Sequence, residues 1–272
     1  MQNTCEDEFD LFLLPHQDDE FGAFFLIDSS LSLGRTPIII FLTNGEYGRA
    51  TTDQRNAESS KVLRQLGVDS ERIWYLGTSS AIKDQGLAES LETIFDAVLA
   101  ALNQYGKPLT IKSVYAPSWE GGHPDHDAAA LLAIAIGRAL CRESHVYQFP
   151  LYNSNKKIFF PYTVLKPILE AGPVKELRIP AKRRLKYLKL CADYKSQWRT
   201  FIGLVPFIFT QYVTRGTQQI QALTALTTSG RPHRGPLLYE RRGWQTWGKF
   251  EQKVAAFRQK HELPLLSRPD AP

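Results

Sequence analysis

The stretch Leu11-Phe-Leu-Leu-Pro-His-Gln-Asp-Asp-Glu20 governs how the rest of this 272-residue chain is interpreted. Its apolar half predicts a buried strand over residues 9–14. A histidine and three acids then follow within five residues. Ligands of open α/β sheets bind beyond the carboxyl ends of the strands. We therefore expect His16, Asp18 and Asp19 to lie at the rim of a sheet, where chemistry is usually done.

Short apolar runs alternate with amphipathic segments as far as residue 149. Strands are predicted at residues 9–14, 37–43, 72–76, 112–116 and 145–149, and helices at residues 20–33, 52–66, 87–105 and 126–141. This alternation predicts right-handed βαβ units. We therefore predict an α/β fold, with a Rossmann-like, mostly parallel sheet that has helices on both faces.

After Pro150 the regular alternation of apolar runs and amphipathic segments ends. We predict a β-excursion at residues 156–164 and 174–179. We also predict a basic helix at residues 181–198, with Leu185, Leu188 and either Cys191 or Ala192 on one side. A loop at residues 230–236 and a last helix at residues 251–261 follow. We expect residues 1–150 to form a catalytic core and residues 151–272 a basic β/α extension. This extension would complete the same domain and its substrate pocket.

The net charge of +5 conceals an uneven distribution, since residues 1–150 carry 11 Lys and Arg against 21 Asp and Glu. The remainder carries 22 against 7 and suits an anionic partner, either a phosphate-bearing substrate or a membrane surface. The alternative is that basic helices are simply solvated. No nucleic-acid-binding motif is present, so no such partner is expected.

The longest apolar run, residues 201–209, is too short to cross a membrane and predicts core or an oligomer contact. Beside basic residues, it also raises the hypothesis of a peripheral contact with an anionic membrane. The acidic, polar start of the chain predicts no signal peptide. Three scattered cysteines favour a reducing compartment, so we expect a cytoplasmic protein.

A second cluster, His123-Pro-Asp-His126, also follows a predicted strand. Three N/O ligands with a position left for water are typical of catalytic zinc, and Fe²⁺ or Mn²⁺ suits the same atoms. We therefore predict a metal site at His16, Asp19 and His126. Asp18 is the expected general base, which takes a proton from metal-activated water.

The other two polar residues of the second cluster, His123 and Asp125, are expected to act after water has been deprotonated. His123, if protonated, is expected to stabilise an oxyanion or to protonate the leaving amine, and Asp125 is expected to orient His123. Any one of these acids alone would more often be a helix N-cap. Two His/Asp clusters at two strand ends favour chemistry instead.

The motifs Pro15-His-Gln-Asp-Asp-Glu20 and Gly122-His-Pro-Asp-His126 resemble those of the PIG-L/LmbE-like family of metal-dependent N-deacetylases, with Gln17 at a position where the family has proline. Weaker similarities are found at residues 43–46, 55–58, 66–68 and 194–197. The resemblance implies a zinc-dependent enzyme that removes the acetyl group from an N-acetyl amino sugar such as N-acetylglucosamine, or from its conjugate.

The resemblance also implies substrate contacts. Arg55 matches a family position that contacts substrate, although an ion pair with Glu58 is the alternative. Asn44 and Glu46 are expected to line the sugar pocket, unless they belong to an ordinary turn. Trp119 is expected either at the pocket lip or packed in the core.

Other functions remain open from the sequence. One is an amidase acting on a different amino-sugar conjugate, and another is a non-catalytic carbohydrate-binding protein on the same fold. A nucleotide-binding Rossmann protein is disfavoured, because no Gly-x-Gly-x-x-Gly follows the first strand. The sequence leaves the identity and linkage of the sugar, the native metal and the oligomeric state undetermined.

Overall fold

The computed structural model describes residues 7–46, 48, 50–105, 109–155 and 162–265, and a sheet of seven strands lies at the centre of these residues. Its parallel part has the order β3 (Ile73–Trp74), β2 (Thr36–Phe41), β1 (Glu8–Leu14), β4 (Thr110–Pro117) and β5 (Val146–Phe149). Antiparallel strands β9 (Thr217–Ala222) and β8 (Val174–Arg178) follow on the β5 side. The predicted α/β fold with a mostly parallel sheet is confirmed.

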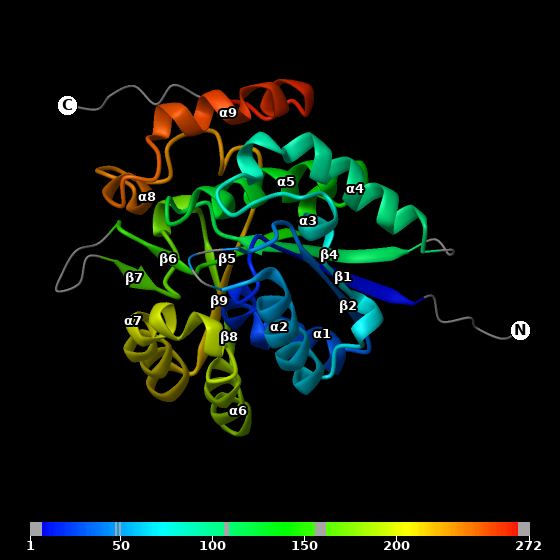
Figure 1. The fold of residues 1–272 in the computed structure, drawn as a ribbon, viewed down its shortest axis with the longest axis vertical. Coiled ribbons are helices and arrows are strands. Elements are labelled where there is room, and N and C mark those ends of the chain that lie inside the picture. The colour runs from blue at the N-terminus through cyan, green and yellow to red at the C-terminus, as the bar shows by residue number, and fades with distance from the viewer. Residues whose placement is uncertain (1–6, 47, 49, 106–108, 156–161, 266–272) are drawn as a thin grey trace, which may run out of the picture.

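Alternate residues of β1 face two different hydrophobic layers, as expected for a strand covered on both sides. Leu11 and Leu13 pack with α4 (Leu91–Asn103), α5 (Pro124–Ala139) and α9 (Trp247–Lys260). Phe12 and Leu14 pack with α1 (Phe24–Ser32), α2 (Thr52–Leu66), α6 (Ala181–Cys191) and α7 (Trp198–Phe209). Figure 1 shows the first group of helices above the sheet and the second group below it.

Local signals explain where the helices next to the site begin. The hydroxyl of Thr51 accepts a hydrogen bond of 3.3 Å from the Gln54 amide, which forms a capping box at the start of α2. α5 begins at Pro124, a residue favoured in the first helical turn. His123 caps α5 by accepting from the Asp125 amide at 3.1 Å. This cap explains why α5 begins two residues before the predicted start.

The C-terminal part differs most from the sequence prediction. The end of the predicted excursion at 156–164 forms β7 (Thr163–Val164), which pairs with β6 (Tyr152–Asn153), while residues 156–161 lie outside the described ranges. β8 does not join this pair. It pairs with β9, a strand that the sequence analysis did not identify.

The predicted basic helix at residues 181–198 is divided, because α6 ends at Cys191 and α7 begins at Trp198. Leu185, which we expected on one side of this helix with Leu188 and Cys191, is 63% exposed. The buried residues of α6 are Tyr187, Leu190 and Cys191. Residues 201–209, predicted as core or an oligomer contact, form most of α7 and bury one of its faces.

Several short elements connect these parts: α3 (Leu76–Ser79), α8 (Leu238–Arg241), 3₁₀ segments η1 (Asp19–Gly22), η2 (Ser70–Arg72), η3 (Leu87–Glu89), η4 (Glu143–His145), η5 (Leu169–Ala171) and η6 (Lys195–Gln197), and the π-helical segment η7 (Thr210–Arg215). The division at residue 150 stays a prediction. No helix within the described ranges has both the length and the apolar character needed to cross a bilayer.

The strand order also fixes where a site can form. β1 pairs with β2 on one side and with β4 on the other. The chain moves outward from β1 to β3 and then returns to β4 beside β1. The loops that follow β1 and β4 therefore separate around a crevice, which is the position at which α/β sheets bind their ligands.

Candidate active site

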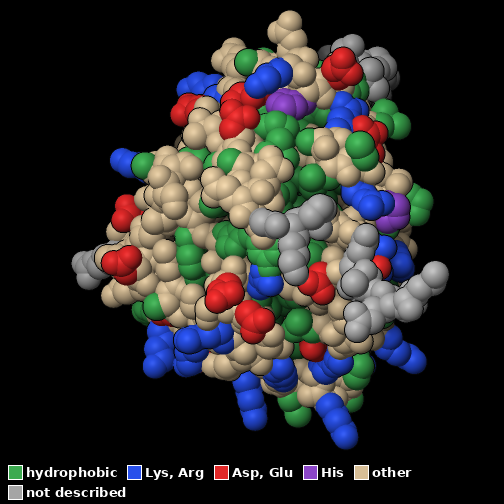
Figure 2. All heavy atoms as spheres, turned by 90° about the vertical axis from the view of Figure 1, so that its right-hand side faces the viewer, with side chains coloured by type: hydrophobic (Ala, Val, Ile, Leu, Met, Phe, Trp, Pro, Cys, Tyr) green, Lys and Arg blue, Asp and Glu red, His purple; other side chains and the backbone are tan. Residues whose placement is uncertain are grey.

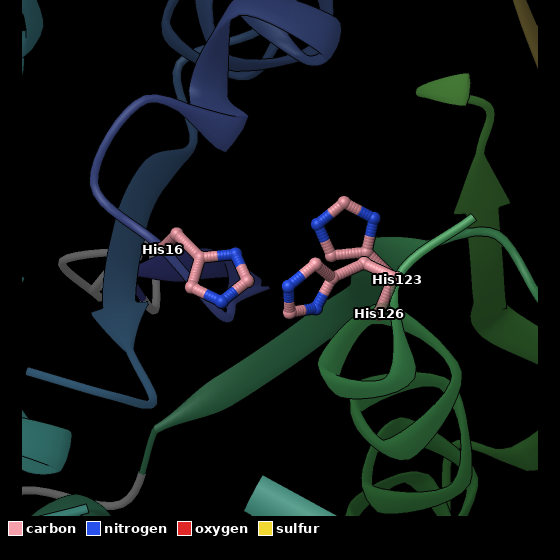
Figure 3. Close-up of side chains that lie close together, drawn as sticks. All are labelled: His16, His123 and His126. Carbon is pink, nitrogen blue, oxygen red and sulfur yellow. The ribbon is translucent and has the colours of Figure 1, made fainter. Parts of the chain in front are cut away.

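Three histidine side chains meet in this crevice. His16 follows β1, whereas His123 and His126 lie at the start of α5 (Figure 3). The ring centroid of His16 lies 4.6 Å from that of His123 and 5.5 Å from that of His126. One nitrogen of each ring lies within 4.8 Å of the others, and all three residues are buried. The two predicted clusters therefore come together in space.

Asp19 lies between two of these rings. Its carboxylate oxygens are 3.3 Å from His16 Nδ1 and 3.1 Å from His126 Nε2. Although burial opposes ionisation, the His126 and His16 imidazoles hold the pKa of Asp19 well below its usual value. The contact with His126 lacks hydrogen-bond geometry, and neither ring nitrogen of this fully buried histidine has a hydrogen-bond partner among the described residues.

A buried imidazole without hydrogen bonds is unusual, because buried polar atoms normally have partners. A metal ion is a partner that such a nitrogen accepts. His16, Asp19 and His126 therefore fit a divalent cation by donor type and by burial. A second group of possible ligands overlaps this one and consists of His16, Asp84, His123 and Asp125.

Asp84 and Asp125 add negative charge on the other side of His16. Their carboxylates lie 3.8 and 3.2 Å from His16 Nε2. Burial disfavours a charged imidazole, but the Asp84 and Asp19 carboxylates outweigh it and raise the pKa of His16 well above its usual value. The carboxylates around His16 therefore favour a positive charge at its ring, which is also what a site for a metal cation requires.

The carboxylate of Asp125 does not orient the His123 ring as we expected. It contacts His16, and it accepts hydrogen bonds from the Gln85 amide at 2.6 Å and the Leu87 amide at 3.1 Å. Only the backbone amide of Asp125 bonds to His123. Asp125 therefore joins His16 to the loop between α3 and η3.

His123 has a defined tautomer. Its Nδ1 accepts the hydrogen bond from the Asp125 amide, so the proton of the neutral ring is on Nε2. Nε2 lies 3.4 Å from Asp84 Oδ1, and the ring contacts Trp244 with centroids 4.8 Å apart. Burial lowers the pKa of His123. Near neutral pH the ring is therefore a neutral hydrogen-bond donor.

Asp18 has an unusual backbone conformation, with φ 133°. This region is rarely occupied by residues other than glycine and costs about 1–3 kcal/mol. The Asp18 amide donates to Glu20 at 2.9 Å, and its carboxylate accepts from Arg55 at 3.0 Å. Burial raises the pKa of Asp18 to about 6. The strained loop therefore directs this carboxylate at the crevice.

Arg55 is buried and does not form the alternative ion pair with Glu58. Its guanidinium donates to the carbonyls of Gln17 and Gly45 as well as to Asp18. Glu58 instead accepts from the amide and hydroxyl of Ser196. Arg55 therefore connects α2 to the loop after β1.

Gln17 also connects these two segments. Its amide nitrogen donates to the side-chain oxygen of Asn56 on α2 at 2.7 Å. A proline at this position would lack that bond. The substitution relative to the family motif therefore exchanges a stiff ring for a hydrogen bond that holds the same loop.

A cavity of about 510 Å³ opens beside these groups. It is lined by the three predicted site residues of the first cluster, His16, Asp18 and Asp19, and also by His123 and Arg55. The sequence analysis did not single out six further lining residues for the site: Asp84, Tyr152, Gln197, Arg199, Arg242 and Trp244. Tyr152 follows β5, so its position beyond a strand end is the one signal that pointed to it.

Three predicted substrate contacts lie elsewhere. Trp119 is 2% exposed and packs on Trp247 and Phe250, and its indole nitrogen donates to the Gly230 carbonyl. It therefore belongs to the core and not to a pocket lip. Asn44 and Glu46 bond to each other in the loop after β2 and do not line the cavity.

The fold and the site together define a class of protein: an α/β protein with a buried His/Asp cluster at the point where its strand order reverses. Residues 11–136 match the family model described as PIG-L: GlcNAc-PI de-N-acetylase, and this part of the chain is a PIG-L family domain. The resemblance predicted from the two motifs is thus confirmed. No curated protein matches the chain in sequence.

Solved structures of low sequence identity share the fold. The conserved protein TT1542 from Thermus thermophilus is 20% identical, with a TM-score of 0.55, 78% of this chain covered and 92% of that chain. The N,N'-diacetylchitobiose deacetylase from Pyrococcus horikoshii is 19% identical, with a TM-score of 0.54 and coverage of 78% and 82%. The zinc-inhibited form of teicoplanin deacetylase Orf2 is 12% identical, with a TM-score of 0.54 and coverage of 78% and 98%.

Proposed function

We propose that this protein is a zinc-dependent hydrolase that removes the acetyl group from an N-acetyl amino sugar of the N-acetylglucosamine type, or from its conjugate. The observation that carries this proposal is that neither ring nitrogen of buried His126 makes a hydrogen bond among the described residues, although Asp19 and His16 lie beside it. The PIG-L family domain at residues 11–136 supports the reaction class. The P. horikoshii structure has a related fold and is itself a deacetylase.

His16, Asp19 and His126 are the residues that would hold the metal. Their mixed nitrogen and oxygen donors suit zinc, and they also suit Fe²⁺ or Mn²⁺. A divalent cation at such a site polarises a carbonyl oxygen and lowers the pKa of water. The rest of the reaction is assigned to side chains of this chain.

Asp18 is the proposed general base. It lines the cavity, and its carboxylate is held by Arg55 and not by the imidazoles, so it is available to accept a proton. Arg55 fixes its orientation from α2. The Arg55 guanidinium also donates to the carbonyls of Gln17 and Gly45, so one side chain holds both the base and its loop.

His123 is the proposed donor to the substrate. The hydrogen bond from the Asp125 amide keeps the ring proton on Nε2, next to the cavity. A neutral N–H group at this position donates a hydrogen bond to the negative charge that forms on the acetamide oxygen. The proton that Asp18 takes from water is the one that is passed to the leaving amine. A carbohydrate-binding protein needs neither this donor nor Asp18.

The cavity mouth favours a conjugate with a negatively charged group. Arg199 and Arg242 both line the cavity, and neither forms an ion pair with a carboxylate among the described residues. Their guanidinium groups suit a phosphate or carboxylate next to the sugar. Trp244 contacts His123 and lines the cavity, so it offers an aromatic face for the sugar ring, a role that the sequence left open for Trp119.

The cellular setting in this proposal is a reducing, cytoplasmic one. Cys141 and Cys191 are free thiols, and Cys5 lies outside the described residues. Free thiols are normal where glutathione keeps cysteines reduced.

The test is the release of acetate and free amine by the zinc-loaded protein. The panel contains free, nucleotide-linked, lipid-linked and polymeric N-acetylglucosamine, with a thiol conjugate as a different amide. We expect equal amounts of acetate and amine from at least one N-acetyl substrate. Asp18→Asn should abolish release while zinc content stays near that of the wild type. Cleavage of the thiol conjugate alone, or full activity of Asp18→Asn, would overturn the proposal.

A further inference from the structure

α7 carries apolar side chains on two of its faces. Phe201, Leu204 and Ile208 are buried in the layer below the sheet. On the other face the exposed fractions are 54% for Trp198, 62% for Ile202, 50% for Val205, 51% for Phe209 and 40% for Val213. The spacing of three or four residues aligns them along one side of α7 and η7. We call these five residues the α7 stripe.

Such a stripe is unusual for a surface helix, which normally has a polar outer face. Among the described residues, five of the ten large apolar side chains with strong exposure belong to the α7 stripe. Single exposed apolar residues are common, but a continuous group marks an interaction surface.

The chain around the α7 stripe is strongly basic. Between Leu177 and Tyr239 there are eleven Lys and Arg and a single acid, Asp193. That acid is already paired with Lys61, at 2.6 Å. The exposed cations of this region include Lys182, Lys189, Lys195, Arg199 and Arg215.

α6 and η7 pack together, with ring centroids of Tyr187 and Tyr212 5.6 Å apart. Figure 1 shows α6 and α7 side by side at the lower end of the molecule. Figure 2 views the molecule from the side opposite α7 and shows Lys and Arg side chains gathered at that end. A basic surface therefore adjoins the elements that carry the α7 stripe.

We propose that the α7 stripe docks the protein on the surface of an anionic lipid bilayer. Apolar side chains would enter the interface between headgroups and acyl chains, and the basic residues of α6 would contact the headgroups. Each Lys or Arg near an anionic membrane adds to the attraction between the protein and the headgroups. A second copy of this chain is a poorer occupant, because two such surfaces would bring like charges together.

The position of α7 gives this docking a consequence for the cavity. Arg199, Gly203 and Leu204 line the cavity, so α7 is a wall between the cavity and the α7 stripe. A docked α7 would hold the cavity close to the membrane surface. The inference does not depend on the proposed deacetylase activity, since lipid binding is measured without turnover.

The first experiment is flotation with vesicles of phosphatidylcholine alone and of phosphatidylcholine mixed with phosphatidylglycerol. We expect binding to the mixed vesicles that weakens with added salt. Ile202→Ser combined with Phe209→Ser, and Lys182→Glu combined with Lys189→Glu, should each reduce the apparent affinity on the order of tenfold or more. Leu226→Ser is the matched control, since Leu226 is 69% exposed and lies outside the α7 stripe, and it should bind like the wild type.

The second experiment uses the fluorescence of Trp198, the tryptophan in the α7 stripe. We expect brominated lipids to quench the wild-type emission and Trp198→Phe to lose that quenching. Absence of binding to anionic vesicles at low salt would overturn the proposal, as would undiminished binding by Ile202→Ser/Phe209→Ser. So would a dimer that this double variant converts to a monomer while neither protein binds vesicles.

Discussion

The guanidinium of Arg55 lies 3.0 Å from Oδ1 of Asp18 and comes from α2, the helix that follows the neighbouring strand. Asp18 is also the residue of this loop with a strained backbone, at φ 133°. The same guanidinium donates to the carbonyls of Gln17 and Gly45. One buried arginine thus holds the strained loop in place and orients the proposed base.

This arrangement predicts that the backbone strain at Asp18 lowers the free energy of unfolding. Asp18→Gly and Asp18→Ala both lose the contact with Arg55, but only glycine adopts a φ of 133° without steric cost. We expect the glycine variant to be more stable than the alanine variant by about 1–3 kcal/mol in urea unfolding. Both variants should fail to release acetate. Equal stabilities would mean that the backbone at Asp18 is not strained in solution.

Asp125 should matter for stability as well as for the site. Its carboxylate accepts from two backbone amides, those of Gln85 and Leu87. Asp125→Ala should therefore lower the free energy of unfolding by about 2–4 kcal/mol and increase hydrogen exchange at both amides. Asp84→Ala is the control from the same loop, because Asp84 accepts no backbone amide in the described hydrogen bonds. Equal effects of the two substitutions would contradict this role.

Trp119 and Trp244 should behave differently, because one is in the core and the other lines the cavity. Trp119→Phe removes the bond to the Gly230 carbonyl and should cost about 1–3 kcal/mol with KM unchanged. Trp244→Phe should raise KM with little loss of stability. Unfolding curves and initial rates separate the two. The reverse pattern would return Trp119 to a substrate role.

Arg242 is expected to select substrates by charge. Arg242→Ala should raise KM for a phosphate-linked amino sugar about tenfold, since a hydrogen bond to a charged group contributes about 1.5–3 kcal/mol. KM for a neutral substrate should hardly change. Arg234→Ala removes an exposed arginine that does not line the cavity and is the matched control. An equal change in KM for charged and neutral substrates would exclude charge recognition by Arg242.

The elements that sequence reasoning identified are those with strong local signals. α2 has the predicted bounds because Thr51 and Gln54 form a capping box next to an amphipathic pattern. β1 was identified by its continuous apolar run, which is typical of a strand buried on both faces. The two His/Asp clusters came together because the parallel strands β1 and β4 are neighbours.

The elements that were missed depend on distant contacts. β9 has the polar sequence Thr-Gln-Gln-Ile-Gln-Ala, and its pairing with β5 and β8 is what makes it a strand. Asp84 and Trp244 reach the cavity from loops whose sequences carry no motif. Trp119 precedes the second cluster, so the sequence left open whether it lies at the pocket lip or in the core. Its burial depends on α9, which packs against it from the far end of the chain.

The central claim is a metal centre held by His16, Asp19 and His126, and zinc affinity tests it most directly. Equilibrium binding is measured for the wild type and for Asp19→Ala, His126→Ala and His123→Ala, each shown to be folded by circular dichroism. We predict that one zinc ion binds per wild-type chain. Asp19→Ala and His126→Ala should each lower the zinc affinity by more than about 100-fold, which exceeds the loss seen when a residue that only hydrogen-bonds to a ligand is replaced. His123→Ala should stay within about tenfold. Wild-type affinity in His126→Ala, or an equal loss in His123→Ala, would contradict this ligand set.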